Sequence, residues 1–178
     1  MDLKQHLRGR NLKWNWDEIA GYCIKHPETV REIVDHCSDE EVIIQQNAGA
    51  VLGKLIDLNK HIIDPYADEL INLLKVDLHD AVKRAILRVF QEADIPEETE
   101  GDLFEFVINA LRSAESSIAI KAFGMTAARR VCEKYPELSN ELIPLIEILV
   151  EQRASTGLVN RGEKELKKLN KLDSSTYQ

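Results

Sequence analysis

A repeat of 37 or 38 residues runs through most of the chain and constrains its fold more than any single residue does. Four groups of apolar residues have the i, i+3, i+4, i+7 spacing that places them on one face of an α-helix. The groups are Val30, Ile33, Val34 and Cys37; Ala67, Leu70, Ile71 and Leu74; Phe104, Val107, Ile108 and Leu111; and Leu142, Leu145, Ile146 and Leu149.

A second apolar series alternates with the first and has a step of 38 residues, with starts at Ile44, Val82, Ile120 and Leu158. Two amphipathic helices in each repeat bury their apolar faces only against each other and against the next repeat. No segment alternates with the period of two that indicates a β-strand. The sequence therefore predicts an all-α fold, an α-solenoid of stacked antiparallel helix pairs.

The breaks between the apolar groups set the expected boundaries. We expect a single domain over residues 15–172, preceded by a basic arm or short capping helix at 1–14 and followed by a polar, frayed tail at 173–178. Asn15 is the expected N-cap of a further capping helix. The helix pairs are expected at 27–37 with 40–58, 65–76 with 79–93, 100–113 with 116–134, and 139–152 with 156–171.

The second helices resemble those of HEAT repeats, in which an apolar residue followed by a basic one precedes a small or apolar residue. The segments from Asp80 through Val82 and Lys83 to Ile86, and from Ile120 and Lys121 to Gly124, carry this pattern. The resemblance covers about residues 16–171, and the last unit looks like the end of a group of small bacterial HEAT-like proteins. It implies a right-handed solenoid of about four units plus an N-terminal capping helix.

The first and last units depart from this pattern. Gln45 and Val159 occupy the positions where the basic residue is expected. A continuous ladder of basic residues along the stack is therefore not supported, whereas the helix pairing is unaffected.

The net charge of −8 is unevenly distributed along the chain. Residues 1–14 carry +3 and residues 151–178 carry +2, which leaves −13 for the residues between them. Proteins that grip a phosphate backbone need clustered basic residues, so this balance argues against nucleic acid as the partner. The chain has no apolar run long enough to span a bilayer and no apolar core of a secretion signal, so we expect a cytoplasmic protein that does not enter membranes.

The reactive side chains form no recognisable catalytic or metal-binding motif. None of the five histidines has a partner at the spacing of a helical metal site. Cys37 follows His36, but it belongs to an apolar group and is expected in the core. Phosphate-binding loops and nucleophile elbows are absent from the sequence. We therefore expect no catalytic residue, no cofactor and no metal, and a protein that is not an enzyme.

Two groups of residues are candidates for binding a partner. The exposed face of the second helices should line the inner curve of the solenoid, with Leu87 and Met125 as apolar spots among polar residues, although a merely solvated face explains the same pattern. Trp14 and Trp16 beside the basic arm either contact a partner or close the open end of the stack. The inner-face candidates are Gln46, Arg84, Leu87, Arg88, Gln91, Met125 and Arg129.

The preferred function is a non-catalytic scaffold that holds an unidentified protein or peptide against this inner face. The alternatives are a nucleic-acid-binding protein of the DNA alkylation repair type and a helical subunit that assembles into homo-oligomers through its stack ends. A repair protein needs a basic groove, which only Arg84, Arg88, Lys121 and Arg129 begin to supply.

Overall fold

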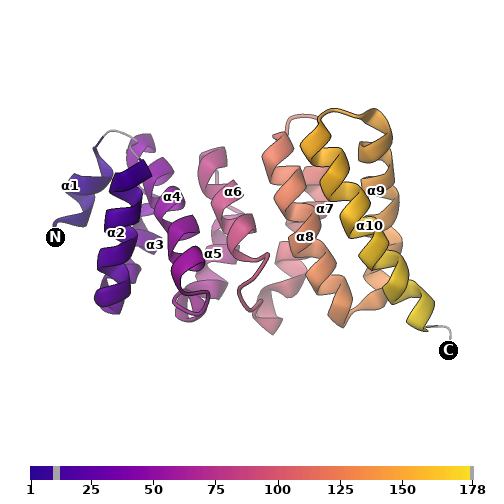
Figure 1. Ribbon diagram of the computed structural model, residues 1–178, viewed down its shortest axis with the longest axis horizontal. Helices are drawn as coiled ribbons and strands as arrows, with labels where there is room; N and C mark the ends of the chain where they lie inside the picture. The colour runs from indigo at the N-terminus through magenta and orange to yellow at the C-terminus, as the bar shows by residue number, and fades with distance from the viewer. Residues whose placement is uncertain (10–12, 177–178) are drawn as a thin grey trace. The chain divides into compact units, whose positions relative to one another are not determined.

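The computed structural model describes the backbone of residues 1–9 and 13–176 and the side chains of residues 1–9 and 15–172. These residues form helices and no strand (Figure 1). The prediction of an all-α chain of paired helices is confirmed. The described residues also include no helix that is long and apolar enough to cross a membrane. The chain divides into two compact units, unit 1 over Met1–Thr99 and unit 2 over Glu100–Gln178.

Unit 1 contains two helix pairs behind two N-terminal helices. The first helix is short, but Leu3 and Leu7 are both buried, so the opening stretch contributes to the core. Helix α4 packs against α2, α3 and α6. The elements are α1 (Leu3–Leu7), α2 (Lys13–Lys25), η1 (Pro27–Thr29), α3 (Val30–His36), α4 (Val42–Leu58), η2 (Asp64–Tyr66), α5 (Ala67–Leu73), α6 (Asp80–Val89) and η3 (Glu97–Thr99).

Unit 2 contains two longer helix pairs. Helix α8 packs against α7 and α10, and α10 also packs against α9. The elements are α7 (Glu100–Arg112), α8 (Ile118–Lys134), η4 (Pro136–Leu138), α9 (Ser139–Gln152) and α10 (Thr156–Thr176).

The apolar repeat forms the core of both units. Fifteen of the sixteen residues in the first apolar series are buried, and the exception, Leu145, is half-buried. The core is mainly aliphatic, with Phe90 as its largest fully buried side chain. Burial of this repeating stripe is the main force that holds each helix to its neighbours.

Helix boundaries follow the predicted breaks with two differences. Helix α2 begins at Lys13, so Asn15 lies inside the helix, where its side chain donates a hydrogen bond to the carbonyl of His6 at 3.2 Å. Helix α10 continues to Thr176, so most of the predicted frayed tail is helical. Pro27, Pro65 and Pro136 each lie in a short 3₁₀ turn before a first helix, where the missing proline N–H costs no helical hydrogen bond.

Candidate functional site

The exposed surface of the second helices in unit 1 is built around an arginine that crosses from α6 to α4. Arg88 donates from Nη2 to Asp57 Oδ1 at 2.7 Å, and both side chains remain partly exposed. Its path lies over Gly53, where an added Cβ would stand 2.6 Å from Arg88 Nη1. Gly53 therefore leaves the space in which the guanidinium lies across α4. Arg84, one turn earlier on α6, is exposed on the same side of the helix.

A second polar contact joins the same two helices near the start of α6. Gln46 Nε2 and His79 Nε2 are 2.9 Å apart, and the backbone N–H of His79 donates to Gln45 Oε1 at 3.2 Å. His79 is also the N-cap of α6, since its Nδ1 accepts from the backbone N–H of Ala81 at 3.1 Å. Gln46 is thus half-buried and held by the cap of the next helix.

Three of the predicted inner-face residues are not exposed. Leu87 and Met125 are each 0% exposed, and Arg129 is 6% exposed. Their positions were assigned to the surface because a second helix was assumed to bury a single stripe. Helix α8 instead packs against α7 on one side and α10 on the other, which covers Met125 and Arg129 within unit 2. The apolar spots that were expected on this face are therefore core residues, and Gln46, Arg84, Arg88 and half-exposed Gln91 remain at the surface of unit 1.

Arg129 belongs to a buried ionic network that the sequence reasoning missed. Its Nε donates to Glu165 Oε2 at 2.6 Å, and Glu165 is 0% exposed. Thr126 donates to the other carboxylate oxygen of Glu165 at 2.9 Å and accepts from Arg161 Nη1 at 2.8 Å. A second guanidinium nitrogen of Arg129 contacts Glu133. The signal was present in the sequence, because Glu165 lies on the stripe of α10 that includes Leu158, Gly162 and Leu169.

Of the two N-terminal tryptophans, only Trp16 has its side chain among the described residues. Trp16 is half-buried and donates from Nε1 to Asn47 Oδ1 at 2.8 Å. Asn47 is itself buried and donates to the carbonyl of Leu7 at 2.6 Å. Trp16 therefore helps to join α1, α2 and α4 in unit 1. The side chain of Trp14 lies outside the described residues.

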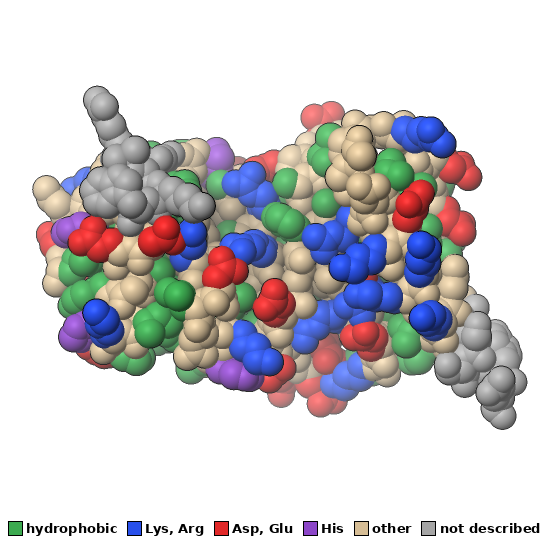
Figure 2. Space-filling view, in the orientation of Figure 1, with side chains coloured by type: hydrophobic (Ala, Val, Ile, Leu, Met, Phe, Trp, Pro, Cys, Tyr) green, Lys and Arg blue, Asp and Glu red, His purple; other side chains and the backbone are tan. Residues whose placement is uncertain are grey.

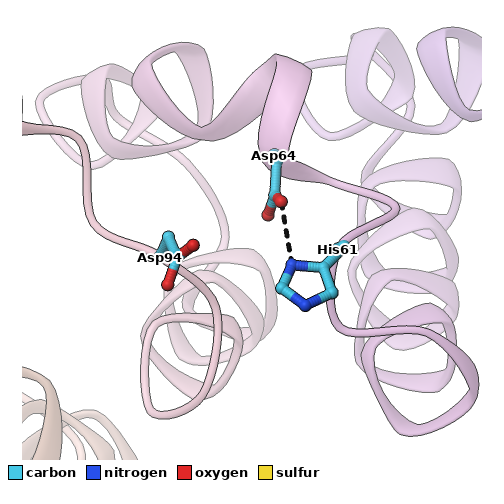
Figure 3. Close-up of side chains that lie close together, drawn as sticks. All are labelled: His61, Asp64 and Asp94. Atoms are coloured by element: carbon cyan, nitrogen blue, oxygen red, sulfur yellow. Dashed lines mark hydrogen bonds and ion pairs between the residues drawn. The ribbon is translucent and has the colours of Figure 1, made fainter.

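A group of possible metal ligands lies in two loops of unit 1 (Figure 3). His61 and Asp64 follow α4, and Asp94 follows α6; their ligand atoms lie within 4.8 Å of one another. His61 Nδ1 and Asp64 Oδ2 are 3.0 Å apart. Sequence spacing on one helix does not find this group, because stacking of successive repeats brings equivalent loops together. All three residues are exposed, and one nitrogen with two carboxylate oxygens is a ligand set that suits a divalent transition metal.

The cysteines have the properties of core residues. All three are buried and unpaired as disulfides. Burial raises the pKa of the Cys132 thiol to about 11 and raises the pKa of Cys37 further. Cys37 Sγ lies 3.4 Å from the carbonyl of Ile33, and His36 Nδ1 lies against Asp39 instead. Because only a thiolate is an effective nucleophile, Cys37 lacks the environment of a catalytic cysteine.

Comparison with known proteins agrees with the helix pairs. The sequence profile of the HEAT repeat domain matches residues 3–169, which includes α1 and α2 and nearly all of both units. Comparison with curated proteins and with solved structures finds no significant match. Since the matched range covers far more than half of the chain, this protein belongs to the HEAT repeat domain family.

Proposed function

We propose that the protein is a non-catalytic scaffold that binds another protein through the exposed second-helix face of unit 1. This face consists of exposed Arg84 and half-exposed Gln46, Arg88 and Gln91, the last of which follows the end of α6. Repeat proteins of this architecture commonly use such surfaces for protein recognition. The match to the HEAT repeat domain supports the coarser part of this proposal, that the chain is a helical repeat protein.

The observation that carries the proposal is the arrangement of Arg88 over Gly53. A guanidinium that an ion pair holds across a neighbouring helix is already oriented before a partner arrives, so less side-chain entropy is lost on binding. Arginine is also among the residues enriched at protein interfaces. Arg84 and Arg88 lie four residues apart and together offer planar donors for carboxylates or backbone carbonyls of a partner.

The proposal also agrees with the chemistry of the described side chains. The buried ionic network of unit 2 is shielded from substrate-sized molecules, and the thiols are in the core. These groups have structural roles in stabilising the fold. Binding of a partner is the function that we assign to the exposed arginines.

The test is an affinity capture with charge-reversed bait. The double variant Arg84→Glu plus Arg88→Glu should lose at least ~10-fold of the proteins that the wild type retains, because charge-assisted contacts become repulsive. A matched control, Lys25→Glu plus Lys60→Glu, makes the same charge change at exposed sites of unit 1 outside this face. Quantitative mass spectrometry of the captured proteins measures the loss.

Two results would count against the proposal. An identical capture profile for wild type and double variant would remove the face as a binding site. An equal loss for the control would show that net charge, rather than this face, decides capture. Circular dichroism of each bait verifies that the helical fold is retained.

A further inference from the structure

Charge in unit 2 is separated between the two layers of helices. The first helices, α7 and α9, contain six Asp or Glu residues and one Arg. The second helices, α8 and α10, contain nine Lys or Arg residues and four Asp or Glu residues. Figure 2 shows the basic side chains gathered over α8 and α10. A sum over the sequence hides this separation, because residues 100–178 carry eleven basic and twelve acidic residues in total.

Four lysines form one exposed stripe on α10, which we call the lysine face: Lys164, Lys167, Lys168 and Lys171. All four are exposed, and their spacing of three, four and seven residues places them on one side of the helix. The stripe is about 10 Å long at a rise of ~1.5 Å per residue. The opposite side of α10 is buried in unit 2, so the lysines project to solvent along the whole stripe.

The acidic residues of α8 and α10 neutralise this face only in part. Glu165 is buried and lies 2.6 Å from Arg129, while Lys168 Nζ is 3.9 Å away from it. Glu133 is engaged by Arg129. Glu163 is exposed one turn before Lys167, and Asp173 follows Lys171 by two residues, with its side chain outside the described residues. The four lysines outnumber these two acids, so the lysine face keeps a net positive charge.

The buried network fixes the direction in which the lysines project. Arg161 of α10 donates to Thr126 of α8, and Thr126 donates to Glu165 of α10. These bonds, together with the pair formed by Arg129 and Glu165, join the two helices at several adjacent turns. Rotation of α10 about its axis would break them, so the register of the lysine face is preorganised.

The residue types indicate the chemical class of the ligand. Protein interfaces are depleted in lysine, whereas arginine and aromatic residues are enriched there. The described residues expose large apolar side chains at Met1, Val42, Leu58, Val76, Ile118 and Ile148, and none of these lies on α10. A membrane-surface helix needs an exposed apolar side, which α10 also lacks. Nucleic-acid interfaces, in contrast, are polar and strongly positive.

We propose that the lysine face of unit 2 binds the sugar-phosphate backbone of a nucleic acid. Lysine ammonium groups are compact, strongly hydrated charges that contact phosphates without bidentate geometry. Contacts of this kind position a nucleic acid but read no bases, so binding is independent of sequence. This activity is separate from the protein-binding face proposed for unit 1 and does not depend on it.

Fluorescence anisotropy with a labelled 20-base-pair DNA duplex tests the proposal. The wild type should bind with Kd of about 10⁻⁴ to 10⁻⁶ M near physiological salt, with log K falling against log salt at a slope of about −3 to −4 for four phosphate contacts. The variant Lys164→Gln, Lys167→Gln, Lys168→Gln and Lys171→Gln should bind at least ~10-fold more weakly at ~100 mM salt and lose most of that slope. Replacement of the same four residues by arginine should retain binding.

A matched control removes four lysines elsewhere: Lys25→Gln, Lys60→Gln, Lys75→Gln and Lys83→Gln, all in unit 1. The control should keep its DNA affinity within about 3-fold, since only distant and screened charges change. A loss equal to that of the first variant would overturn the proposal. Circular dichroism of both variants verifies that each retains its helical content.

Two other probes separate the remaining ligand classes under the same salt conditions. Phosphatidylserine vesicles report on an acidic membrane, and poly-glutamate reports on an acidic protein segment. Tighter binding of either probe than of the duplex, with loss in the four-lysine variant, would assign the lysine face to that ligand instead. No duplex binding at ~50 mM salt, where phosphate contacts are only weakly screened, would also reject the proposal.

Discussion

The second helices of the two units differ in where the carboxylates lie that pair with their basic side chains. In unit 1, Arg88 is paired at the surface with Asp57, and Lys54 with Asp17 at 2.6 Å. In unit 2, the pair formed by Arg129 and Glu165 is buried, while the lysine face lies in solvent. Where the partner carboxylates lie at the surface, as Asp57 and Asp17 do in unit 1, the basic residues of the second helices are neutralised there. Where the carboxylate is buried, as Glu165 is in unit 2, the surface of the second helix stays positive.

The exposed pairs of unit 1 and the buried pair of unit 2 also differ in their contribution to the free energy of unfolding. An exposed pair contributes little to stability because water solvates both charges in either state. A buried pair is costly to break, because removal of one partner leaves an uncompensated charge in a low-dielectric environment. The Arg88 pair of unit 1 is therefore available for recognition, whereas the Arg129 pair of unit 2 is required for the fold.

The largest expected effect tests this contrast directly. Arg129→Met should destabilise the protein by about 3–5 kcal/mol, because Glu165 would lose its buried partner. The double variant Arg129→Met plus Glu165→Leu should recover part of this loss, since no buried charge remains. Arg88→Met, the matched change at the exposed pair of unit 1, should cost only ~0–1 kcal/mol. Urea denaturation followed by circular dichroism measures all three.

Equal costs for Arg129→Met and Arg88→Met would abolish the distinction between the two units. A loss of unfolding free energy below ~1 kcal/mol for Arg129→Met would show that the pair of Arg129 and Glu165 behaves like a solvated surface ion pair.

A smaller effect is expected at two glycines that make room for a neighbour. An added Cβ at Gly162 in unit 2 would stand 2.5 Å from Val150 Cγ2 and 3.1 Å from Ile146 Cγ2, which are short, stiff core side chains. Gly162→Ala should therefore cost about 1–3 kcal/mol through overpacking. At Gly53 in unit 1 the short contact is with the far end of Arg88, which can move. Gly53→Ala should be close to neutral or gain up to ~1 kcal/mol from helix propensity.

Thermal unfolding of the two alanine variants, compared with wild type, distinguishes these outcomes. A stabilised Gly162→Ala variant would show that α9 and α10 are loosely packed. A strongly destabilised Gly53→Ala variant would show that Arg88 is rigidly required where it lies, which would strengthen the case for a preorganised arginine in unit 1.

The third prediction concerns the acid sensitivity of unit 1. Burial opposes ionisation of Asp39, but hydrogen bonds from Lys4, the backbone N–H of Glu41 and His36 outweigh it and lower the pKa of its carboxyl to about 2. The ordinary value is 3.8, so the folded state favours the ionised form. Its contribution to stability is complete above pH ~4 and is lost as the pH falls towards ~2. Lys4 lies on α1, so this helix should lose protection first.

Hydrogen exchange of α1 amides between pH 4 and pH 2 measures this effect, with rates corrected for the intrinsic pH dependence. Asp39→Asn should remove the pH dependence of α1 protection in this interval. The same slope in wild type and variant would mean that another carboxyl of unit 1 controls the attachment of α1.

The repeat could be predicted from the sequence because it arises from residues that are close together in the chain. A helix face with apolar residues every three or four positions must be buried, whatever covers it, so the pairs, the 37- or 38-residue step and the core residues were predicted correctly. Leu145, the one member of the first apolar series that is only half-buried, lies at the edge of its stripe.

The surfaces were not predictable to the same degree. Met125 and Arg129 were placed on an exposed face because the sequence does not show that α8 contacts two neighbours, and Leu87 of α6 was placed there by the same assumption of a single buried stripe. Glu165 lies at a buried stripe position, but its partner, Arg129, is 36 residues away in the preceding repeat. The group formed by His61, Asp64 and Asp94 likewise arises from stacked loops. None of these contacts follows from spacing on one helix.

The sequence by itself determined the helix pairs and the apolar stripe that joins them, because backbone geometry and the hydrophobic effect act over a few residues at a time. Only the tertiary structure decided which charges are buried and which remain in solvent, because electrostatic energy depends on distances between residues far apart in the chain. A net charge of −8 therefore coexists with a lysine face on α10, because the acid beneath that face, Glu165, is buried and paired with Arg129.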